Sequence, residues 1–273
     1  MIRIFKKVSL LGCLVAAIGL GGCTEDKNGD RLIFSIEDDI KLGAQVSHEV
    51  DSTYQAKGQL LDPANPKNKV AYEHLNRIVN KILSSGKVSY SSEFAWDTKI
   101  IKDDNVLNAF ATPGGHIYVF SGLIKYLDNE DQFAGVLGHE IAHADQRHST
   151  KQLQRQYGLT ILLSVALGSN PGTLTEIAAN LATLKFDRDA EREADDYSVV
   201  YLGGTNYYAC NSAAGFFEKI LKDNQQGRTP EFLSTHPDPG NRVEAINNKA
   251  AAEGCRTQLS GATTYQDFKN SLN

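Results

Sequence analysis

The sequence has few of the features that define several other classes of protein. Lysine and arginine number 28 against 33 acidic residues, a net charge of −5, so the basic face of a nucleic-acid binder is not indicated, and we expect no nucleic-acid partner. Seven prolines and 23 glycines in 273 residues are too few for a fibrous chain. A hydrophobic fraction of 41% is too high for a disordered one. Four cysteines are too few for a scaffold held by disulfides.

The first residues have the pattern of an export signal. Basic residues open the chain, and an uncharged apolar run over 8–20 follows, which is shorter than the roughly 20 residues that span a bilayer. The run ends in Leu-Gly-Gly-Cys at Cys23. This ending resembles a bacterial lipobox, which implies a lipoprotein signal peptide over 1–22 and a lipid on Cys23. The alternatives are an ordinary signal peptide with a coincidental cysteine, and an uncleaved anchor.

The segment that follows the predicted signal indicates where the protein is located. Residues 23–34 are polar and predict a tether, so the lipid would anchor the protein to a membrane. Thr24 stands where an aspartate would mark retention at the inner membrane, which favours an outer-membrane lipoprotein that faces the periplasm. Because that compartment is oxidising, Cys210 and Cys255 are expected to form a disulfide, two unpaired thiols being the alternative.

Hydrophobic spacing in the rest of the chain, residues 35–273, predicts a single domain of class α+β. Alternation near 94–100 and apolar stretches over 106–111 and 116–120 predict three strands, the last two joined by a Thr-Pro-Gly-Gly turn. Helical spacing predicts the remaining elements. These are a helix that starts after Ser35, followed by helices over 70–83, 129–148, 153–167, 173–202, 207–223 and 239–252.

The strongest chemical pattern is His139-Glu140-x-x-His143. Two histidines four residues apart lie on one face of a helix, one turn apart, so both imidazoles can reach one Zn²⁺. Glu140 projects from the adjoining side, where a carboxylate can act as a general base. The alternative is a pair of surface histidines on an amphipathic helix.

A catalytic zinc needs a third protein ligand, and a charged helix further along supplies candidates. Glu191 and Asp195 share one helix face, so one can bind metal while the other accepts a hydrogen bond from a ligand histidine. Glu193 points away from that face. His148 falls nearly opposite His139 on the helical wheel, so we expect it to be solvated. A solvated charge run is the alternative for the acidic segment.

Together, these motifs resemble the HtpX-like and CAAX-prenyl-protease-like family of gluzincin zinc metallopeptidases, and within it the small periplasmic LoiP-type lipoproteins. Segments 108–115, 117–123 and 234–237 agree with this resemblance, which covers about residues 35–250. It implies a mostly helical, minigluzincin-like metallopeptidase domain with a small three-stranded sheet beside the zinc helix.

The resemblance also implies a set of site residues. One Zn²⁺ per chain would be bound by His139, His143 and Glu191, with Glu140 as the general base. With Glu191 on the metal, the shared helix face leaves Asp195 to accept a hydrogen bond from a ligand histidine. His236 would either donate to the oxyanion or bind the metal at rest as a fourth ligand. A surface turn is the alternative for His236.

The strand beside the metal has an expected role in binding substrate. Asn108, Ala109, Phe110 and Ala111 can pair with an extended substrate backbone, which an unfolded protein offers and a folded one does not. A plain structural strand is the alternative. We therefore expect a zinc endopeptidase of the bacterial cell envelope that cleaves unfolded or misassembled proteins. The rival hypothesis is a chaperone-like assembly factor that binds clients through the same strand with little turnover.

Overall fold

A computed structural model describes residues 24–25, 31–32, 34–224, 231–237 and 241–273 of the chain. The chain divides after residue 33 into two units, and Phe34–Asn273 form the larger one. In the smaller unit, β1(Thr24–Glu25) and β2(Arg31–Leu32) pair antiparallel. The predicted signal peptide and Cys23 lie outside the described residues.

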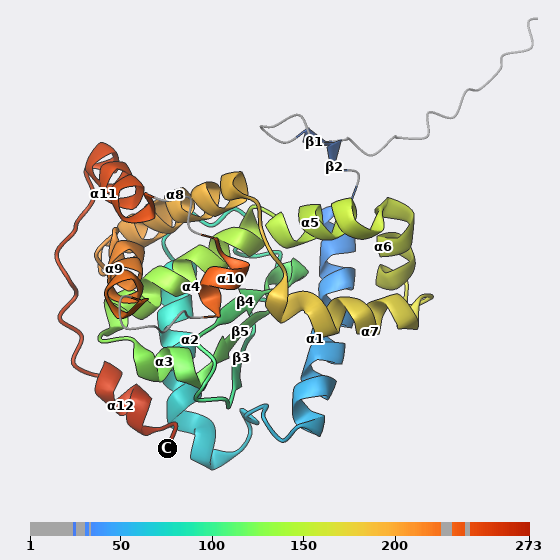
Figure 1. Cartoon of the computed structure of the whole chain (residues 1–273), viewed down its shortest axis with the longest axis horizontal. Coiled ribbons are helices and arrows are strands. Elements are labelled where there is room, and N and C mark those ends of the chain that lie inside the picture. The colour runs from blue at the N-terminus through green and yellow to red at the C-terminus, as the bar shows by residue number, and fades with distance from the viewer. Residues whose placement is uncertain (1–23, 26–30, 33, 225–230, 238–240) are drawn as a thin grey trace, which may run out of the picture. The chain divides into compact units, whose positions relative to one another are not determined.

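In the larger unit, helices surround a small sheet (Figure 1). This confirms the predicted mostly helical α+β fold with three strands. Its first elements are α1(Ile36–Ala56), η1(Pro66–Asn68), α2(Lys69–Leu83), β3(Thr98–Ile101), β4(Ala109–Ala111), η2(Pro113–Gly115), β5(Ile117–Phe120) and α3(Ser121–Tyr126). The helices α4(Glu130–Asp145), α5(His148–Tyr157), α6(Leu159–Ala166), α7(Pro171–Asn180), η3(Leu181–Thr183) and α8(Arg188–Thr205) follow. The last are α9(Ser212–Asn224), α10(Phe232–Thr235), α11(Arg242–Glu253) and α12(Tyr265–Asn270).

The sheet has the order β3-β5-β4, so β4 is an edge strand. β3 runs parallel to β5, whereas β4 runs antiparallel to it, with Phe110 opposite Tyr118. The predicted turn joins β4 to β5, and its two glycines have positive φ, 73° at Gly114 and 83° at Gly115. The helix α4 packs against β4 on one side and against α8 and α9 on others.

The helix α1 begins where the sequence predicts. Ser35 is its N-cap, and Ser35 and Asp38 form a reciprocal capping box. One turn further, the buried carboxylate of Asp39 accepts a hydrogen bond from Thr150 Oγ1 at 2.7 Å and pairs with Arg147 Nε at 2.5 Å. These contacts fasten the start of α1 to Arg147, between α4 and α5, and to the first turn of α5.

Three helices that hydrophobic spacing predicts as continuous are interrupted, so those predictions were wrong. The helix predicted over 129–148 ends at Asp145, because Arg147 adopts a left-handed conformation with φ 60°. The helix predicted over 153–167 breaks at Gly158, with φ 79°. The helix predicted over 173–202 breaks before Asp187, whose side chain caps the N-terminus of α8 by accepting from two backbone N–H groups.

The N-terminus of α4 is held by two buried acids. Glu130 accepts two hydrogen bonds from Arg77, at 2.7 and 2.6 Å, and a third from Tyr208 at 2.8 Å. Asp131 accepts from the backbone N–H of Ser260 at 3.0 Å, in the segment after α11. The C-terminal segment therefore fastens the same end of α4 that α2 supports.

Cys210 and Cys255 form the predicted disulfide, which links the segment between α8 and α9 to the end of α11 across a sequence separation of 45 residues. A loop of that length corresponds to about 4 kcal/mol in the chain-entropy model. Next to it, Cys210 N–H donates to Arg256 O at 2.7 Å. Across the described part of the chain, every helix is too short or too polar to cross a bilayer.

We expect Glu130→Gln to destabilise the protein by about 1–3 kcal/mol at neutral pH, because Arg77 would lose its charged partner. Burial raises the pKa of Glu130, but the hydrogen bonds from Arg77 and Tyr208 outweigh burial and hold the pKa below its ordinary value of 4.5. This stability is therefore present above the ordinary glutamate pKa and is lost as the pH falls through the lowered one. Urea unfolding at a series of pH values measures both effects.

Asp128→Asn is the matched control, because Asp128 lies two residues before Glu130 and its exposed carboxylate pairs with Lys219 on α9. It should change the free energy of unfolding by less than about 1 kcal/mol. A deficit in Glu130→Gln that persists unchanged at acidic pH would contradict the electrostatic explanation.

Candidate metal centre

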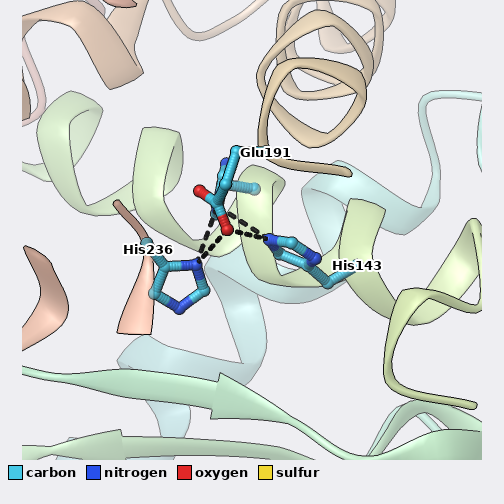
Figure 2. A group of neighbouring side chains, drawn as sticks. His143, Glu191 and His236 are labelled. Carbon is cyan, nitrogen blue, oxygen red and sulfur yellow. Dashed lines mark hydrogen bonds and ion pairs between the residues drawn. The ribbon is translucent and has the colours of Figure 1, made fainter. Parts of the chain in front are cut away.

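Four buried side chains from three helical segments converge on one point. His139 and His143 lie on α4, Glu191 lies on the first turn of α8, and His236 follows α10. One ligand atom from each lies within 4.8 Å of the other three. Figure 2 shows the Glu191 carboxylate pointing toward the rings of both His143 and His236.

The ring nitrogens of the two α4 histidines face each other across the convergence point. His139 Nε2 lies 3.0 Å from His143 Nε2. Glu191 completes the group, with Oε2 3.4 Å from His139 Nε2 and Oε1 3.4 Å from His143 Nε2. The structure therefore brings together the three residues that the sequence predicts as ligands. His236 Nδ1 joins them, 3.0 Å from Glu191 Oε1.

Asp195 and Arg242 support this group from behind. Asp195 Oδ1 lies 2.9 Å from His139 Nδ1, the nitrogen that points away from the other rings. Arg242 Nε and Nη2 donate to the two Asp195 oxygens at 2.7 and 2.6 Å. Arg242 Nη1 also lies 3.0 Å from Glu191 Oε2, so one guanidinium neutralises both acids.

His148 is buried beside His143, so the expectation that it is solvated was wrong. Its Nδ1 lies 3.0 Å from His143 Nδ1, and its Nε2 lies 3.1 Å from Glu193 Oε2. The left-handed residue Arg147 ends α4 and brings His148 back against the helix. A helical wheel over 129–148 cannot show this, because the wheel assumes an uninterrupted helix.

Aromatic rings fix the orientation of two site histidines. Phe186, in the interruption before α8, stacks on His143 with centroids 4.0 Å apart. Phe232 stacks on His236 at 4.2 Å and 18°. Motif spacing indicates neither ring. Phe186 falls within the helix predicted over 173–202, and Phe232 lies outside the predicted helices and motifs.

Glu140 is fully buried, and neither of its carboxylate oxygens has a hydrogen-bond partner among the described residues. His236 Nε2 lies 3.5 Å from Glu140 Oε1. Burial raises the pKa of Glu140. A buried carboxylate with open acceptor sites suits a group that exchanges a proton with a small ligand.

The protonation of the cluster follows from its neighbours. Burial alone would lower the pKa of His139, but the hydrogen bonds to Asp195 and Glu191 outweigh burial and raise it to about 9. Burial lowers the pKa of His143 well below its ordinary value. Burial raises the pKa of Glu191, but His236, His139 and His143 outweigh it and hold the pKa well below its ordinary value. Without metal, a protonated His139 therefore lies beside an ionised Glu191.

The donor set fits zinc. Two imidazoles and one carboxylate are the ligands of many catalytic zinc sites, which leave a further position for water or substrate. A bound cation would replace the proton on His139, and water bound to that cation could donate to the unpartnered oxygens of Glu140. His139, His143 and Glu191 would hold the metal, and His236 lies close enough to join them.

The predicted substrate strand lies at the sheet edge, and part of that edge is occupied. Asn108 O accepts from Phe120 N on β5, so the alternating pattern directs the backbone groups of Ala109 and Ala111 to the other side. Ser149 Oγ donates to Ala111 O at 3.0 Å, so this carbonyl is engaged. Asn108 Nδ2 donates to Ala182 O at 3.0 Å, and its buried Oδ1 has no partner among the described residues.

Comparison with known proteins identifies the family. The profile of peptidase family M48 matches residues 71–250, which include all four side chains of the cluster. The chain belongs to peptidase family M48. Zinc is the metal that this metallopeptidase family uses, in agreement with the donor set. The match confirms the metallopeptidase resemblance that the sequence motifs indicate.

Three curated relatives illustrate the family. Mitochondrial metalloendopeptidase OMA1 of Schizosaccharomyces pombe is 29% identical over 212 residues, which cover 76% of this chain and 61% of the relative. The beta-barrel assembly-enhancing protease of Escherichia coli is 33% identical over 165 residues, 55% of this chain and 34% of the relative. Metalloprotease YcaL of Escherichia coli is 30% identical over 153 residues, 54% of this chain and 59% of the relative. The chain thus spans less than two thirds of each relative's length.

We expect zinc binding to this M48 peptidase to release close to one proton at neutral pH, because His139 Nε2 must give up its proton to become a ligand. Apparent zinc affinity should rise about tenfold per pH unit toward the His139 pKa of about 9, and then level off. Calorimetry in buffers of different ionisation enthalpy counts the proton. An affinity that stays constant over this pH range would contradict the assignment.

Glu191→Gln should weaken zinc binding by more than the roughly 10–100-fold typical of changes to residues that only support a ligand. The neutral amide is a poorer ligand than a carboxylate and leaves Arg242 without one of its acids. Metal analysis and chelator competition on the purified protein measure the change. Asp189→Asn, on the exposed side of the same helix turn, should retain normal zinc content. Normal zinc content in Glu191→Gln would remove Glu191 from the ligand set.

Proposed function

We propose that the chain is a zinc-dependent metalloendopeptidase. The convergence of His139, His143 and Glu191 beside the unpartnered carboxylate of Glu140 carries this proposal. Membership of a peptidase family supports it.

The proposed mechanism assigns a role to each side chain. When bound, zinc would polarise the scissile carbonyl and make water a stronger acid. Glu140 then accepts the proton of the attacking water and returns it to the leaving amine. His236 Nε2, 3.5 Å from Glu140, donates to the developing oxyanion. Its Nδ1 faces Glu191 at 3.0 Å, which suits the alternative role of a fourth ligand at rest.

We propose that the substrates are unfolded or misassembled proteins. Ala109 and Ala111 direct backbone groups to the side of the edge strand that faces away from β5. Both residues are buried, 1% and 5% exposed, so an extended segment would pair with them after the residues that cover this edge move aside. Because Ser149 occupies Ala111 O, pairing would use Ala109 N–H and C=O and Ala111 N–H. Asn108 Oδ1 adds an acceptor at the same edge. Pairing of this kind recognises main chain rather than a particular side chain.

We propose a bacterial envelope location for this activity. Residues 1–22 would be a signal peptide, Cys23 the lipidated first residue at the outer membrane, residues 23–34 a tether, and 35–273 a single metallopeptidase domain in the periplasm. The relative named for enhancing beta-barrel assembly supports envelope proteins as clients. The disulfide between Cys210 and Cys255 suits an oxidising compartment.

The rival function is a chaperone-like assembly factor that holds clients on β4 and turns them over slowly. The occupied carbonyl of Ala111 argues for short, transient pairing rather than a long added strand. The buried, unpartnered Glu140 has a clear use in hydrolysis and none in holding a client.

Glu140→Gln should bind zinc nearly as tightly as the unchanged protein, because Glu140 is not among the four convergent side chains. Cleavage of casein should fall by at least about 10³-fold, since the amide cannot accept the water proton. Metal analysis together with a casein digestion assay measures both properties.

The same variant separates the two functions. If the intact protein restores envelope assembly in a deletion strain and Glu140→Gln restores it equally well, the assembly-factor hypothesis is correct and the peptidase hypothesis is wrong for the cellular role. Chelator treatment of the unchanged protein serves as the control for metal dependence, and readdition of zinc should restore cleavage.

A further inference from the structure

A second histidine and a carboxylate lie behind the ligand His143, on the side away from the other ligands. His148 Nδ1 lies 3.0 Å from His143 Nδ1, and His148 Nε2 lies 3.1 Å from Glu193 Oε2. His148 is 3% exposed, whereas the Glu193 side chain is 27% exposed. The three groups therefore form a line from the buried centre to the surface.

The chemistry of the rings fixes the direction of every hydrogen bond in this line. His143 can offer Nε2 to the metal only if its ring proton is on Nδ1. That N–H must then donate to His148 Nδ1, so the ring proton of a neutral His148 is on Nε2. This second N–H donates in turn to Glu193, which as a carboxylate can only accept. The opposite direction would place a proton on His143 Nε2, where the metal must bind.

We propose that His148 and Glu193 are positioning residues that fix the tautomer and the ring orientation of the ligand His143. A partner on the distal nitrogen of a ligand histidine orients the ring and raises its basicity. His139 has such a partner in Asp195, directly. His143 obtains the same support through an inserted imidazole. This inference rests on the proposed metal site.

The fold holds His148 in place independently of the metal. Arg147, the left-handed residue before it, lies 2.5 Å from Asp39 through Nε. Thr150, two residues after it, donates to the other oxygen of Asp39 at 2.7 Å. The first turn of α5 is thus fastened to α1, and His148 sits in that turn. The acceptor for His143 is therefore already in position before a ligand arrives.

The test compares zinc dissociation constants by chelator competition. His148→Leu keeps the apolar volume but removes the acceptor, and should weaken zinc binding about 10–100-fold. His148→Gln retains a carbonyl that can accept from His143 Nδ1–H, and should recover most of that loss. Glu193→Gln keeps an acceptor for His148 without its charge, and should have a smaller effect than His148→Leu.

His116→Leu is the matched control, because His116 is also a buried histidine paired with a carboxylate, Asp97, but lies outside the ligand cluster. It should lower the thermal unfolding midpoint of the metal-free protein and leave zinc affinity unchanged. If His148 were merely structural, His148→Leu would behave like this control, and the proposal would be overturned.

Tautomers can be read in the unchanged protein, so the test does not depend on variants that fold. Two-bond ¹⁵N–¹H correlation spectra of the zinc-loaded protein should show the proton of His143 on Nδ1 and that of His148 on Nε2. A proton on His148 Nδ1 would overturn the proposal. Failure of the unchanged protein to bind zinc would refute the metal site itself, whereas tight binding that is indifferent to His148→Leu would refute only the positioning role.

Discussion

Two buried acids one turn apart on α8, Glu191 and Asp195, and the cations that neutralise them, determine how the site is assembled. An ionised carboxylate that loses its partner inside a protein costs several kcal/mol. Arg242, only 2% exposed, pairs with both acids at once and is stacked on the ring of Phe217, 3.9 Å away. Because Arg242 opens α11 and His139 lies on α4, satisfying the two acids brings three helices together. Electrostatics thus imposes the geometry that metal binding uses.

Close packing of α4 gives this geometry its rigidity. The helix is buried nearly all round, and two of its glycines allow neighbours to approach. A Cβ on Gly135 would lie 2.4 Å from Ala213 N, and one on Gly138 would lie 2.8 Å from Ser198 Oγ. A side chain at position 135 would meet the backbone of α9 and push that helix away, whereas one at position 138 would displace the Ser198 hydroxyl, which donates to Gly135 O. The ligands are therefore carried by a helix that cannot shift without opening the core.

The chemistry of the site was largely predictable from sequence, because it depends on local spacing. The positions of His139, His143 and Glu191 follow from helical periodicity and family motifs, and the structure brings them together. The groups that support them were less predictable, because they depend on where helices end. Arg147 leaves the helical region although nothing in its hydrophobic spacing indicates a break, and this single φ angle turns His148 from a surface residue into a buried one.

The interruption before α8 has a similar origin and a similar consequence. Spacing over 173–202 favours one helix, but Asp187 caps a new helix instead, and the extended residues before it place Phe186 on the ring of His143. The acids of α8 differ in the direction in which their side chains point. Glu191 and Asp195 face α4 directly, whereas Glu193 reaches His143 only because the turn at Arg147 inserts His148 between them. The two breaks in periodicity are thus the features that complete the surroundings of the ligand His143.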